Sequence, residues 1–305
     1  MSGLAELVQA VREAPEDLSL RLVIADWFQE HGDPRGELIA AACRLAGRGL
    51  SPATRGMLTK RVDALMQAHE HTWARPVSDL GVRWTFRRGF VHSMHGDVQR
   101  ILEGWQSVIE VEPVVHVELR DCDADAMEQL AGSELLRAIL HLTIRGTIGD
   151  EGVRHLVAAP GFGTLERLNL KSTGLTDDAV ERLANVAGFR PRRLTLTDNE
   201  ITDDGARALV ESEVLQRIEC LFLARTQLGD DGVSALAQSP HLGQLRELGL
   251  GSLEELTSEG AGALAQSPHL TSLQYLEVDS CWELGESDID ALRQRVARVR
   301  SDYGS

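Results

Sequence analysis

One pattern occurs seven times between residues 113 and 305, at a period of 25 to 28 residues. Its clearest copies, at 165–184 and 218–237, contain L-x-x-L-x-L, a short polar turn, an acidic segment close to T-D-D-G, and a segment ending in Leu-Ala. Alternating leucines indicate a strand, and the later apolar residues have the spacing of a helix. A unit of one strand and one helix cannot bury its apolar side alone. The copies must therefore stack on one another as a solenoid.

Each copy has one apolar anchor in its strand: Val117, Leu142, Leu168, Leu194, Leu221, Leu248 and Leu276. This repeat resembles that of leucine-rich repeat proteins of the ribonuclease-inhibitor-like subclass, over residues 113–305. The resemblance implies an α/β fold, a horseshoe with parallel strands on the concave side and helices on the convex side. The subclass includes inhibitors, GTPase activators of the Ran type and adaptors, so the fold does not select one function.

Residues 1–75 have a different pattern, in which apolar residues at helical spacing predict a small all-helical domain. Residues 25–37 contain the motif A-D-W-x-x-E-x-G-D-P-R-G-E. This motif resembles the repeat-companion domain of bacteria such as myxobacteria and planctomycetes, a short helical module that commonly precedes repeats. The resemblance implies no activity for the module.

The motif contains a dense polar cluster: Asp26, Glu30, His31, Asp33, Arg35 and Glu37. One interpretation is a metal or acid/base site built from Asp26, His31 and Asp33, which would require these side chains to converge on one point. The other, which we favour, is a salt-bridge network between helices. In that network Arg35 pairs with Asp26 or Glu37.

Residues 76–112 are expected to form strands on both sides of an Arg88-Gly89 turn, followed by a helix over 97–110. This segment directly precedes the first repeat, so we interpret it as the N-terminal cap of the solenoid. Arginines among aromatic residues can also indicate nucleic-acid binding, but no basic tract continues from this segment. At the other end, a last helix with Ile289, Leu292, Val296 and Val299 on its inner side is expected to form a helical cap. Its arginines, including Arg298 and Arg300, would lie on its outer side.

The charge is unevenly distributed. The chain has 31 basic and 47 acidic residues, and residues 113–305 contain 18 and 32 of these. An acidic domain is a poor general binder of nucleic acid, because neutralising phosphates supplies most of that affinity. Much of the acid lies in the T-D-D-G segments, where we expect it to cap helices and to aid solubility.

The four cysteines, at positions 43, 122, 220 and 281, have neither paired nor metal-type spacing and are expected to be buried and reduced. The chain has no long apolar run for a membrane span, and its start lacks the features of a secretion signal. We therefore expect a cytoplasmic monomer without cofactor or metal.

The strand register predicts which side chains lie on the concave face. Ten of them are candidate partner-binding residues: His116, Arg120, His141, Arg145, Arg167, Lys171, Arg193, Phe222, Tyr275 and Glu277. The face is predicted to be basic in its first half and apolar in the middle, with Phe222 and Tyr275 as anchors. Its end, with Glu277 and Asp279, is predicted to be acidic.

A row of like charges inside an acidic domain suggests a docking surface for a protein partner with an acidic segment. We therefore predict a non-enzymatic interaction module, an adaptor or scaffold. The sequence contains no G-x-S-x-G, phosphate-loop or H-E-x-x-H motif. The alternatives are a regulator of an enzyme, as an inhibitor or a Ran-type GTPase activator, and a nucleic-acid binder. Asn199 occupies a turn where Ran-type activators place a functional asparagine, but that position is structural in most repeats.

Overall fold

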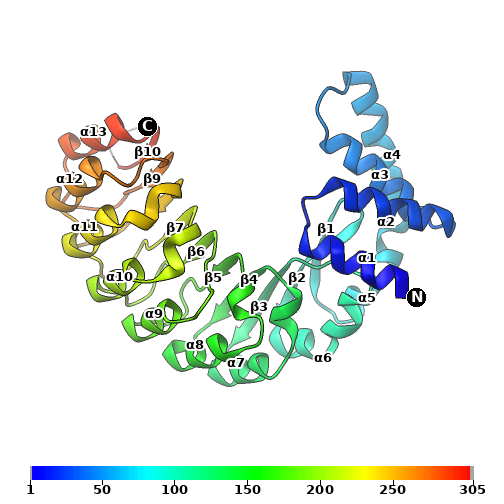
Figure 1. The fold of residues 1–305 in the computed structure, drawn as a ribbon, viewed down its shortest axis with the longest axis horizontal. Coiled ribbons are helices and arrows are strands. Elements are labelled where there is room, and N and C mark those ends of the chain that lie inside the picture. The colour runs from blue at the N-terminus through cyan, green and yellow to red at the C-terminus, as the bar shows by residue number, and fades with distance from the viewer. Residues whose placement is uncertain (1, 303–305) are drawn as a thin grey trace. The chain divides into compact units, whose positions relative to one another are not determined.

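The computed structural model describes residues 2–302, so the outer ends of the predicted domains, at residues 1 and 305, lie outside the described residues. Contacts divide the chain into two compact units, Met1–Leu119 and Arg120–Ser305. The first unit is mostly helical, and the second consists of stacked strand-and-helix repeats (Figure 1). The predicted α/β solenoid with a helical segment before it is confirmed.

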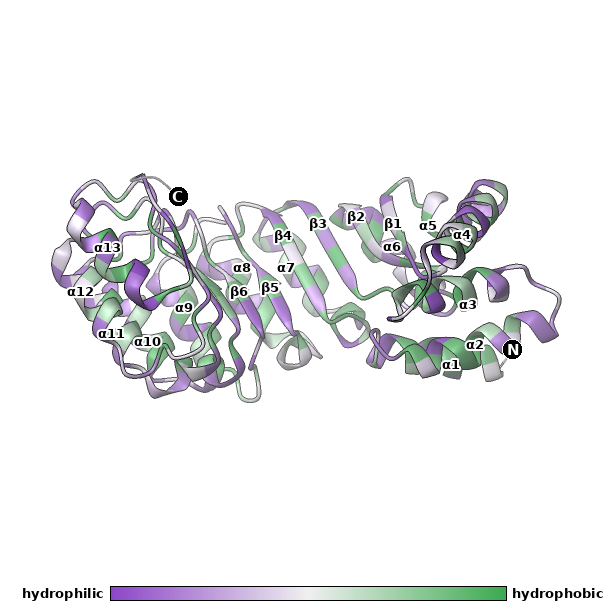
Figure 2. Ribbon diagram, turned by 90° about the horizontal axis from the view of Figure 1, so that it is seen from above, coloured by the Kyte–Doolittle hydropathy of each residue, from purple (hydrophilic) through white to green (hydrophobic). Residues whose placement is uncertain are grey.

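The first unit begins with helices and continues with a hairpin. Its elements are α1 (Ser2–Glu13), α2 (Leu18–Glu30), α3 (Arg35–Ala46), α4 (Pro52–Trp73), α5 (Arg75–Ser78), β1 (Arg83–Arg87), β2 (Phe90–Asp97) and α6 (Val98–Ile109). Both polar and apolar residues occur along α1 and α2 (Figure 2), as expected for helices with one buried side. β1 and β2 pair antiparallel around Arg88 and Gly89, which confirms the predicted turn. The helix predicted over 97–110 is α6, whose N-cap Asp97 accepts a hydrogen bond from the Arg100 amide.

The helices and the hairpin of the first unit share a core. Phe90 of β2 packs in one cluster with Val8, Ile24 and Ile39 from α1, α2 and α3. Phe86 of β1 packs against a second cluster that includes Trp73 of α4. Residues 1–75 and 76–112, which we expected as separate segments, therefore bury apolar surface against each other.

Arg35 lies at the centre of this core and is only 5% exposed. Its Nη2 pairs with Glu112, which is fully buried, and its Nε donates a hydrogen bond to the Gly89 carbonyl oxygen at 2.7 Å. The other oxygen of Glu112 accepts a hydrogen bond from the Val91 amide at 2.8 Å. The guanidinium carbon also lies 4.6 to 5.8 Å from the ring centres of four aromatic residues: Phe28, Trp73, Phe86 and Phe90. Burial raises the pKa of Glu112, whereas Arg35 and the Val91 amide oppose that rise.

The predicted pairing of Arg35 with Asp26 or Glu37 is therefore wrong. Glu37 instead accepts two hydrogen bonds from Arg61 of α4, at 2.6 and 2.5 Å, and Asp33 caps the start of α3 through the Arg35 amide. His31 stacks on Trp27 and contacts the Trp27 carbonyl oxygen. Among the described residues, no group of three His, Cys, Asp or Glu side chains is arranged to hold a metal ion.

In the second unit, strands lie along the inner side of an arc and helices along its outer side (Figure 1). Its strands are β4 (His141–Gly146), β5 (Arg167–Asn169), β6 (Arg193–Thr195), β7 (Cys220–Phe222), β8 (Glu247–Gly249), β9 (Tyr275–Glu277) and β10 (Arg298–Arg300); β3 (His116–Cys122) crosses the division between the units. Its helices are α7 (Ala124–Ala131), α8 (Gly149–Ala158), α9 (Asp177–Ala184), α10 (Asp203–Val210), α11 (Asp230–Gln238), α12 (Ser258–Gln266) and α13 (Glu286–Arg295). Short 3₁₀ helices follow several of them, at Leu135–Ala138, Phe162–Thr164, Glu213–Arg217 and Pro240–Gln244.

The strands from β4 to β10 pair in chain order, all parallel. The predicted anchors Leu142, Leu168, Leu194, Leu221, Leu248 and Leu276 are partners in this register, and each is at most 1% exposed. The side chains next to each anchor face the other side of the sheet, because side chains alternate along a strand. The predicted register is therefore confirmed over these six repeats.

β10 was not predicted. We expected Val296 and Val299 to continue the last helix, but α13 ends at Arg295, and Arg298–Arg300 pairs with β9 as a parallel strand. Val299 is buried on the core side, between Arg298 and Arg300 on the opposite face. The prediction of an entirely helical C-terminal cap, with these arginines on its outer side, is thus wrong for the last turn.

A row of left-handed residues follows the strands. Ser172, Asp198, Arg225, Ser252 and Ser280 have φ between 57° and 60°, a region that costs energy for residues other than glycine. Backbone hydrogen bonds between repeats offset that cost. The amides of Ser172, Asp198, Arg225 and Ser252 donate to the carbonyl oxygens of Thr197, Ala224, Gly251 and Asp279 in the following repeats, at 2.7 to 3.0 Å.

The T-D-D-G segments connect neighbouring repeats. Thr202 caps α10, and the first aspartate of the preceding repeat, Asp177, accepts hydrogen bonds from the Thr202 amide at 2.9 Å and hydroxyl at 2.6 Å. Asp150 binds Thr176 in the same way, and Asp230 binds Thr257. We call these contacts the aspartate ladder. These aspartates therefore join repeats, in addition to the capping that we expected of the acidic segments.

In the segments at 202–205 and 229–232, the glycine makes room for the ladder, whereas the segment at 176–179 has Ala179 at this position. A Cβ atom at Gly205 would lie 2.4 Å from the Asp177 Oδ1, and one at Gly232 would lie 2.4 Å from the Asp203 Oδ1. A real Cβ atom does not approach an oxygen so closely. In the segment at 202–205, Thr202 caps the helix and Asp203 accepts a hydrogen bond from the next repeat. Gly205 leaves room for Asp177 of the previous repeat.

We expect Gly232→Ala to destabilise the protein by about 1–3 kcal/mol, because its Cβ would also lie 3.1 Å from the Asp203 Cα, which cannot easily move. Gly262→Ala in α12 is the matched control, since its Cβ would meet nothing nearer than the Gln266 Nε2 at 3.8 Å. There alanine should stabilise the helix by about 1 kcal/mol. Urea unfolding of both variants measures the difference. Shifts of the same sign would contradict the role of glycine in the ladder.

Candidate binding surface on the strand side of the repeats

The inner side of the second unit carries three aligned rows of side chains. One row runs His141, Arg167, Arg193, Cys220, Glu247, Tyr275 and Arg298, and the next runs Thr143, Asn169, Thr195, Phe222, Gly249, Glu277 and Arg300. Arg145, Lys171, Thr197, Ala224, Gly251 and Asp279 follow two residues beyond the second row. Six of the ten predicted residues belong to the first two rows, and Arg145 and Lys171 belong to the third.

Arg145, Arg167 and Lys171 are exposed side chains on β4, on β5 and directly after β5. Within residues 2–302, none of the three has a carboxylate within ion-pair distance. Arg167 is aligned with Arg193 on β6, so like charges face each other on neighbouring strands. The two positive charges repel each other, and a bound anion would reduce this repulsion.

Arg193 differs from these three cations. Its Nη2 pairs with Glu247 of β8 at 3.0 Å, and its guanidinium carbon lies 5.2 Å from the centre of the Phe222 ring. Cys220 lies in the row between Arg193 and Glu247, and burial raises the pKa of its thiol to about 11. The Cys220 thiol is therefore protonated at neutral pH and a poor nucleophile.

A depression of about 440 Å³ lies on this face, beside the basic side chains. Phe222 and Ala224 line it, with Lys171 and the pair Glu277 and Asp279. Two glycines keep it open. A Cβ atom at Gly249 would lie 2.5 Å from the Phe222 ring, and one at Gly251 would lie 2.8 Å from the Asp279 Oδ1.

The predicted acidic end of the face is partly neutralised. Arg300 of β10 pairs with Glu277 at 3.0 Å and with Asp279 at 3.1 Å, and Arg298 lies over the Tyr275 ring at 5.5 Å. Burial, followed by the charge of Asp279, raises the pKa of Glu277. The predicted gradient from basic to acidic is thus wrong at its far end. Sequence analysis missed Arg298 and Arg300 because their strand lacks the L-x-x-L-x-L pattern of the repeats, although the alternation Arg-Val-Arg was a usable signal.

Three predicted residues lie at the start of the rows. His116 belongs to the first unit, where its ring meets that of His95 edge to face at 5.5 Å. Arg120 follows in β3 and His141 begins β4, and both are half-buried. All three interact with other residues, so they do not belong with the unpaired cations.

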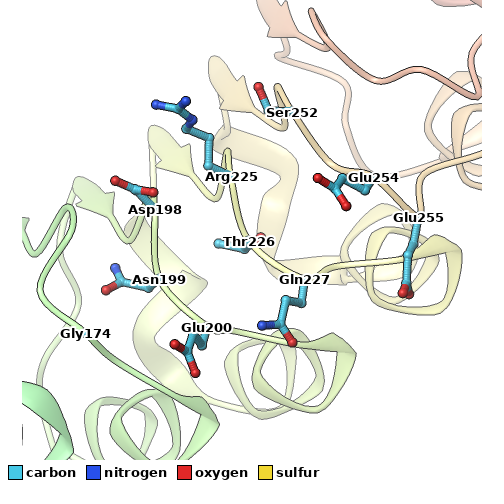
Figure 3. Close-up of a pocket in the computed structure, with 10 residues that line it drawn as sticks. All are labelled: Gly174, Asp198, Asn199, Glu200, Arg225, Thr226, Gln227, Ser252, Glu254 and Glu255. Atoms are coloured by element: carbon cyan, nitrogen blue, oxygen red, sulfur yellow. The ribbon is translucent and has the colours of Figure 1, made fainter.

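A second depression, of about 610 Å³, follows the turns after β6, β7 and β8. Figure 3 shows Asp198, Arg225 and Ser252 at equivalent positions of successive turns, with Glu200, Glu254 and Glu255 beside them. Arg225 and Ser252 line both depressions. Asn199 lies at the base of one of these turns and is 7% exposed.

Asn199 uses both of its amide atoms within the fold. Its Oδ1 accepts hydrogen bonds from the amides of Thr173 and Leu175 at 3.1 Å. Its Nδ2 donates to the carbonyl oxygens of Leu170 and Leu196 at 2.9 and 2.8 Å, with a longer contact to Thr197. The side chain therefore joins two neighbouring repeats.

Two segments of the second unit, residues 192–210 and 218–237, match the family model described as Leucine Rich repeat. These segments run from the strand to the helix of two successive repeats, around β6 with α10 and β7 with α11. The chain contains leucine-rich repeats. The strands from β4 to β10 share one register, and the aspartate ladder extends over four junctions, from Asp150 to Thr257.

Solved structures of leucine-rich repeat type resemble the chain only distantly. An internalin from Listeria monocytogenes is 17% identical, with 68% of this chain and 51% of that chain covered and a TM-score of 0.44. A chain of the Rad7 and Elc1 complex in yeast is 15% identical, with 68% and 62% covered and a TM-score of 0.43. The chain thus spans about half to three fifths of the length of these relatives. No curated protein matches the sequence.

Within residues 2–302, no helix is both long enough and apolar enough to span a bilayer.

Proposed function

We propose that the chain is a non-enzymatic interaction module that binds an acidic segment of a partner protein on the strand side of its leucine-rich repeats. We further propose that it acts as a cytoplasmic, monomeric adaptor. The observation that carries the proposal is the set of three exposed, unpaired cations, Arg145, Arg167 and Lys171, beside the depression lined by Phe222. We call this set with Phe222 the basic docking face.

The basic docking face has the chemistry of an interface hot spot. An aromatic ring beside an open depression can accept an apolar side chain, and unpaired cations nearby select for acidic neighbours. Short strands hold these side chains at fixed spacing, so the face is organised before a partner arrives. The Arg193 guanidinium packs over the Phe222 ring. Gly249 leaves room for the ring, because a side chain at this position would collide with it.

The test uses a partner captured from the native host with the full chain and then purified. Charge reversal at Arg145 and Lys171, to Glu, should weaken its binding at least tenfold, because two attractive charges become repulsive. The matched control reverses Arg182 and Arg217, exposed arginines on α9 and in the 3₁₀ helix Glu213–Arg217. Equal loss in both variants, or no loss in the first, would overturn the proposed location. Calorimetric titration gives both affinities.

The same titration at rising salt concentration separates nucleic acid from a protein partner. A basic docking face of three cations predicts a shallow dependence of the affinity on salt, whereas a nucleic-acid site that neutralises many phosphates loses affinity steeply. The GTPase-activator alternative has no support from Asn199, because the fold itself occupies the amide of this residue.

A further inference from the structure

The first unit contains a cluster of three arginines, two of which share one carboxylate. Glu16, in the turn between α1 and α2, pairs with Arg87 at 2.6 Å and with Arg88 at 3.0 Å. Arg87 ends β1, and Arg88 is the left-handed residue of the hairpin turn, with φ of 51°. Arg21 of α2 is the third member, because its Nε donates a hydrogen bond at 3.1 Å to the carbonyl oxygen of Pro15, the neighbour of Glu16.

Arg21 is an unusual arginine. It is only 2% exposed, its guanidinium carbon lies 6.0 Å from the centre of the Phe90 ring, and its Nη1 has no hydrogen-bond partner. A buried donor without an acceptor costs about 1–3 kcal/mol, so a structure retains one only where something else compensates. Glu16 pairs with the exposed Arg87 and with the half-buried Arg88, and leaves this donor of Arg21 without a partner.

Burial and the neighbouring positive charges together shift the pKa values of groups around this cluster. Burial, followed by the charge of Arg88, lowers the pKa of Arg21 to about 10. Burial, followed by the charges of Arg87 and Arg21, lowers the pKa of His92 to about 4, so His92 is neutral at pH 7. Partial burial opposes ionisation of Glu16, yet Arg87 and Arg88 lower its pKa below the ordinary value.

We propose that Arg21, Arg87 and Arg88 form a binding site for a phosphate dianion, and that Glu16 occupies this site as an internal competitor. Once Glu16 leaves, three guanidinium groups face the two negative charges of a phosphate monoester near neutral pH, so the site stays attractive for a dianion. Arginine is suited to this ligand because its planar fork binds two phosphate oxygens at once. The phosphate would bind Arg87 and Arg88 directly, and the buried guanidinium of Arg21, whose Nη1 has no hydrogen-bond partner, would add its positive charge beside them.

Glu16 is free to leave the site. Its side chain is 62% exposed, and it lies in the turn between α1 and α2, outside both helices. Its departure would break no backbone hydrogen bond of those helices. The competitor therefore sets the affinity for phosphate without supporting the fold.

The test is a titration of the full chain with inorganic phosphate at about pH 7.5, where phosphate is mostly a dianion, followed by ³¹P NMR. Glu16→Gln should bind phosphate at least about tenfold more tightly than the unchanged protein, because the competing carboxylate is gone. Adding Arg88→Ala to Glu16→Gln should abolish that gain. A phosphoserine peptide in a parallel titration shows the source: tighter binding of the peptide indicates a phosphorylated protein, and equal binding indicates a small phosphate.

Glu37→Gln is the matched control. It removes one exposed carboxylate, as Glu16→Gln does, but this carboxylate pairs with a single arginine, Arg61. If Glu16→Gln binds phosphate no better than Glu37→Gln does, the site does not exist. Survival of the gain after loss of Arg88 would also overturn the proposal. Circular dichroism of each variant, which should match that of the unchanged protein, shows that these outcomes do not arise from misfolding.

Discussion

Replacement of Glu112 by leucine should destabilise the first unit by about 3–5 kcal/mol, because it leaves the buried guanidinium of Arg35 without its counter-charge. Glu112 also accepts the Val91 amide at 2.8 Å, and that donor would lose its partner at the same time. Four of the five tryptophans, at positions 27, 73, 84 and 105, lie in the first unit. Tryptophan fluorescence during urea unfolding therefore reports this unit.

Two further variants complete this experiment. Glu103→Leu, on the exposed side of α6, removes a carboxylate that has no such role and should change the stability by less than about 0.5 kcal/mol. Combining Arg35→Met with Glu112→Leu should cost less than the sum of the single changes, since a buried pair replaced as a whole leaves no lone charge. Additive losses would show that the two side chains act independently.

Asn199→Leu should destabilise the second unit by at least about 4 kcal/mol. Leucine has a similar size, but it leaves four buried backbone groups without their partner, the amides of Thr173 and Leu175 and the carbonyl groups of Leu170 and Leu196. Each unsatisfied group costs about 1–3 kcal/mol, which relaxation of the turn can reduce in part. Far-UV circular dichroism during urea unfolding measures the loss.

The next repeat offers the control for Asn199. Thr226 occupies the equivalent position and donates one hydrogen bond, from its hydroxyl to the Leu223 carbonyl oxygen at 2.7 Å. Thr226→Val should therefore cost only about 1 kcal/mol. The repeat after that has Leu253 at this position, fully buried and apolar. A smaller loss for Asn199→Leu than for Thr226→Val would refute the fastening role.

The sequence predicted the strands, turns and helices whose signals lie within a short stretch of the chain. The anchors from Leu142 to Leu276 fell into register because alternation and period are visible within one repeat. The turn at Arg88 and Gly89 and helix α6 were predicted for the same reason. The rows that contain Arg167, Arg193 and Phe222 then followed from the register alone.

Contacts between distant parts of the chain could not be predicted. Glu112 lies 77 residues from Arg35, and nothing in its own neighbourhood marks it as the partner. Each aspartate of the ladder reaches about one period ahead, from Asp177 to Thr202 for example, so its role is visible only when two repeats are stacked. Acidic residues at a helix start are already explained by capping. Their hydrogen bonds to the threonine of the next repeat were therefore not predicted.

The aspartate ladder has consequences for how the array loses its structure. Asp150, Asp177 and Asp230 each accept hydrogen bonds from both the amide and the hydroxyl of a threonine in the next repeat. Asp203 accepts a hydrogen bond from an amide only, because its partner Gly229 has no hydroxyl. In an array where each repeat contacts only its neighbours, cooperativity depends on the interfaces between repeats. The junction between α10 and α11 is therefore the weakest rung among these four. When the array unfolds in part, we expect the repeats up to α10, which include Asn199, to separate from the repeats that begin with β7. Phe222 of β7 lies directly at this junction, so the depression that it lines would be lost first.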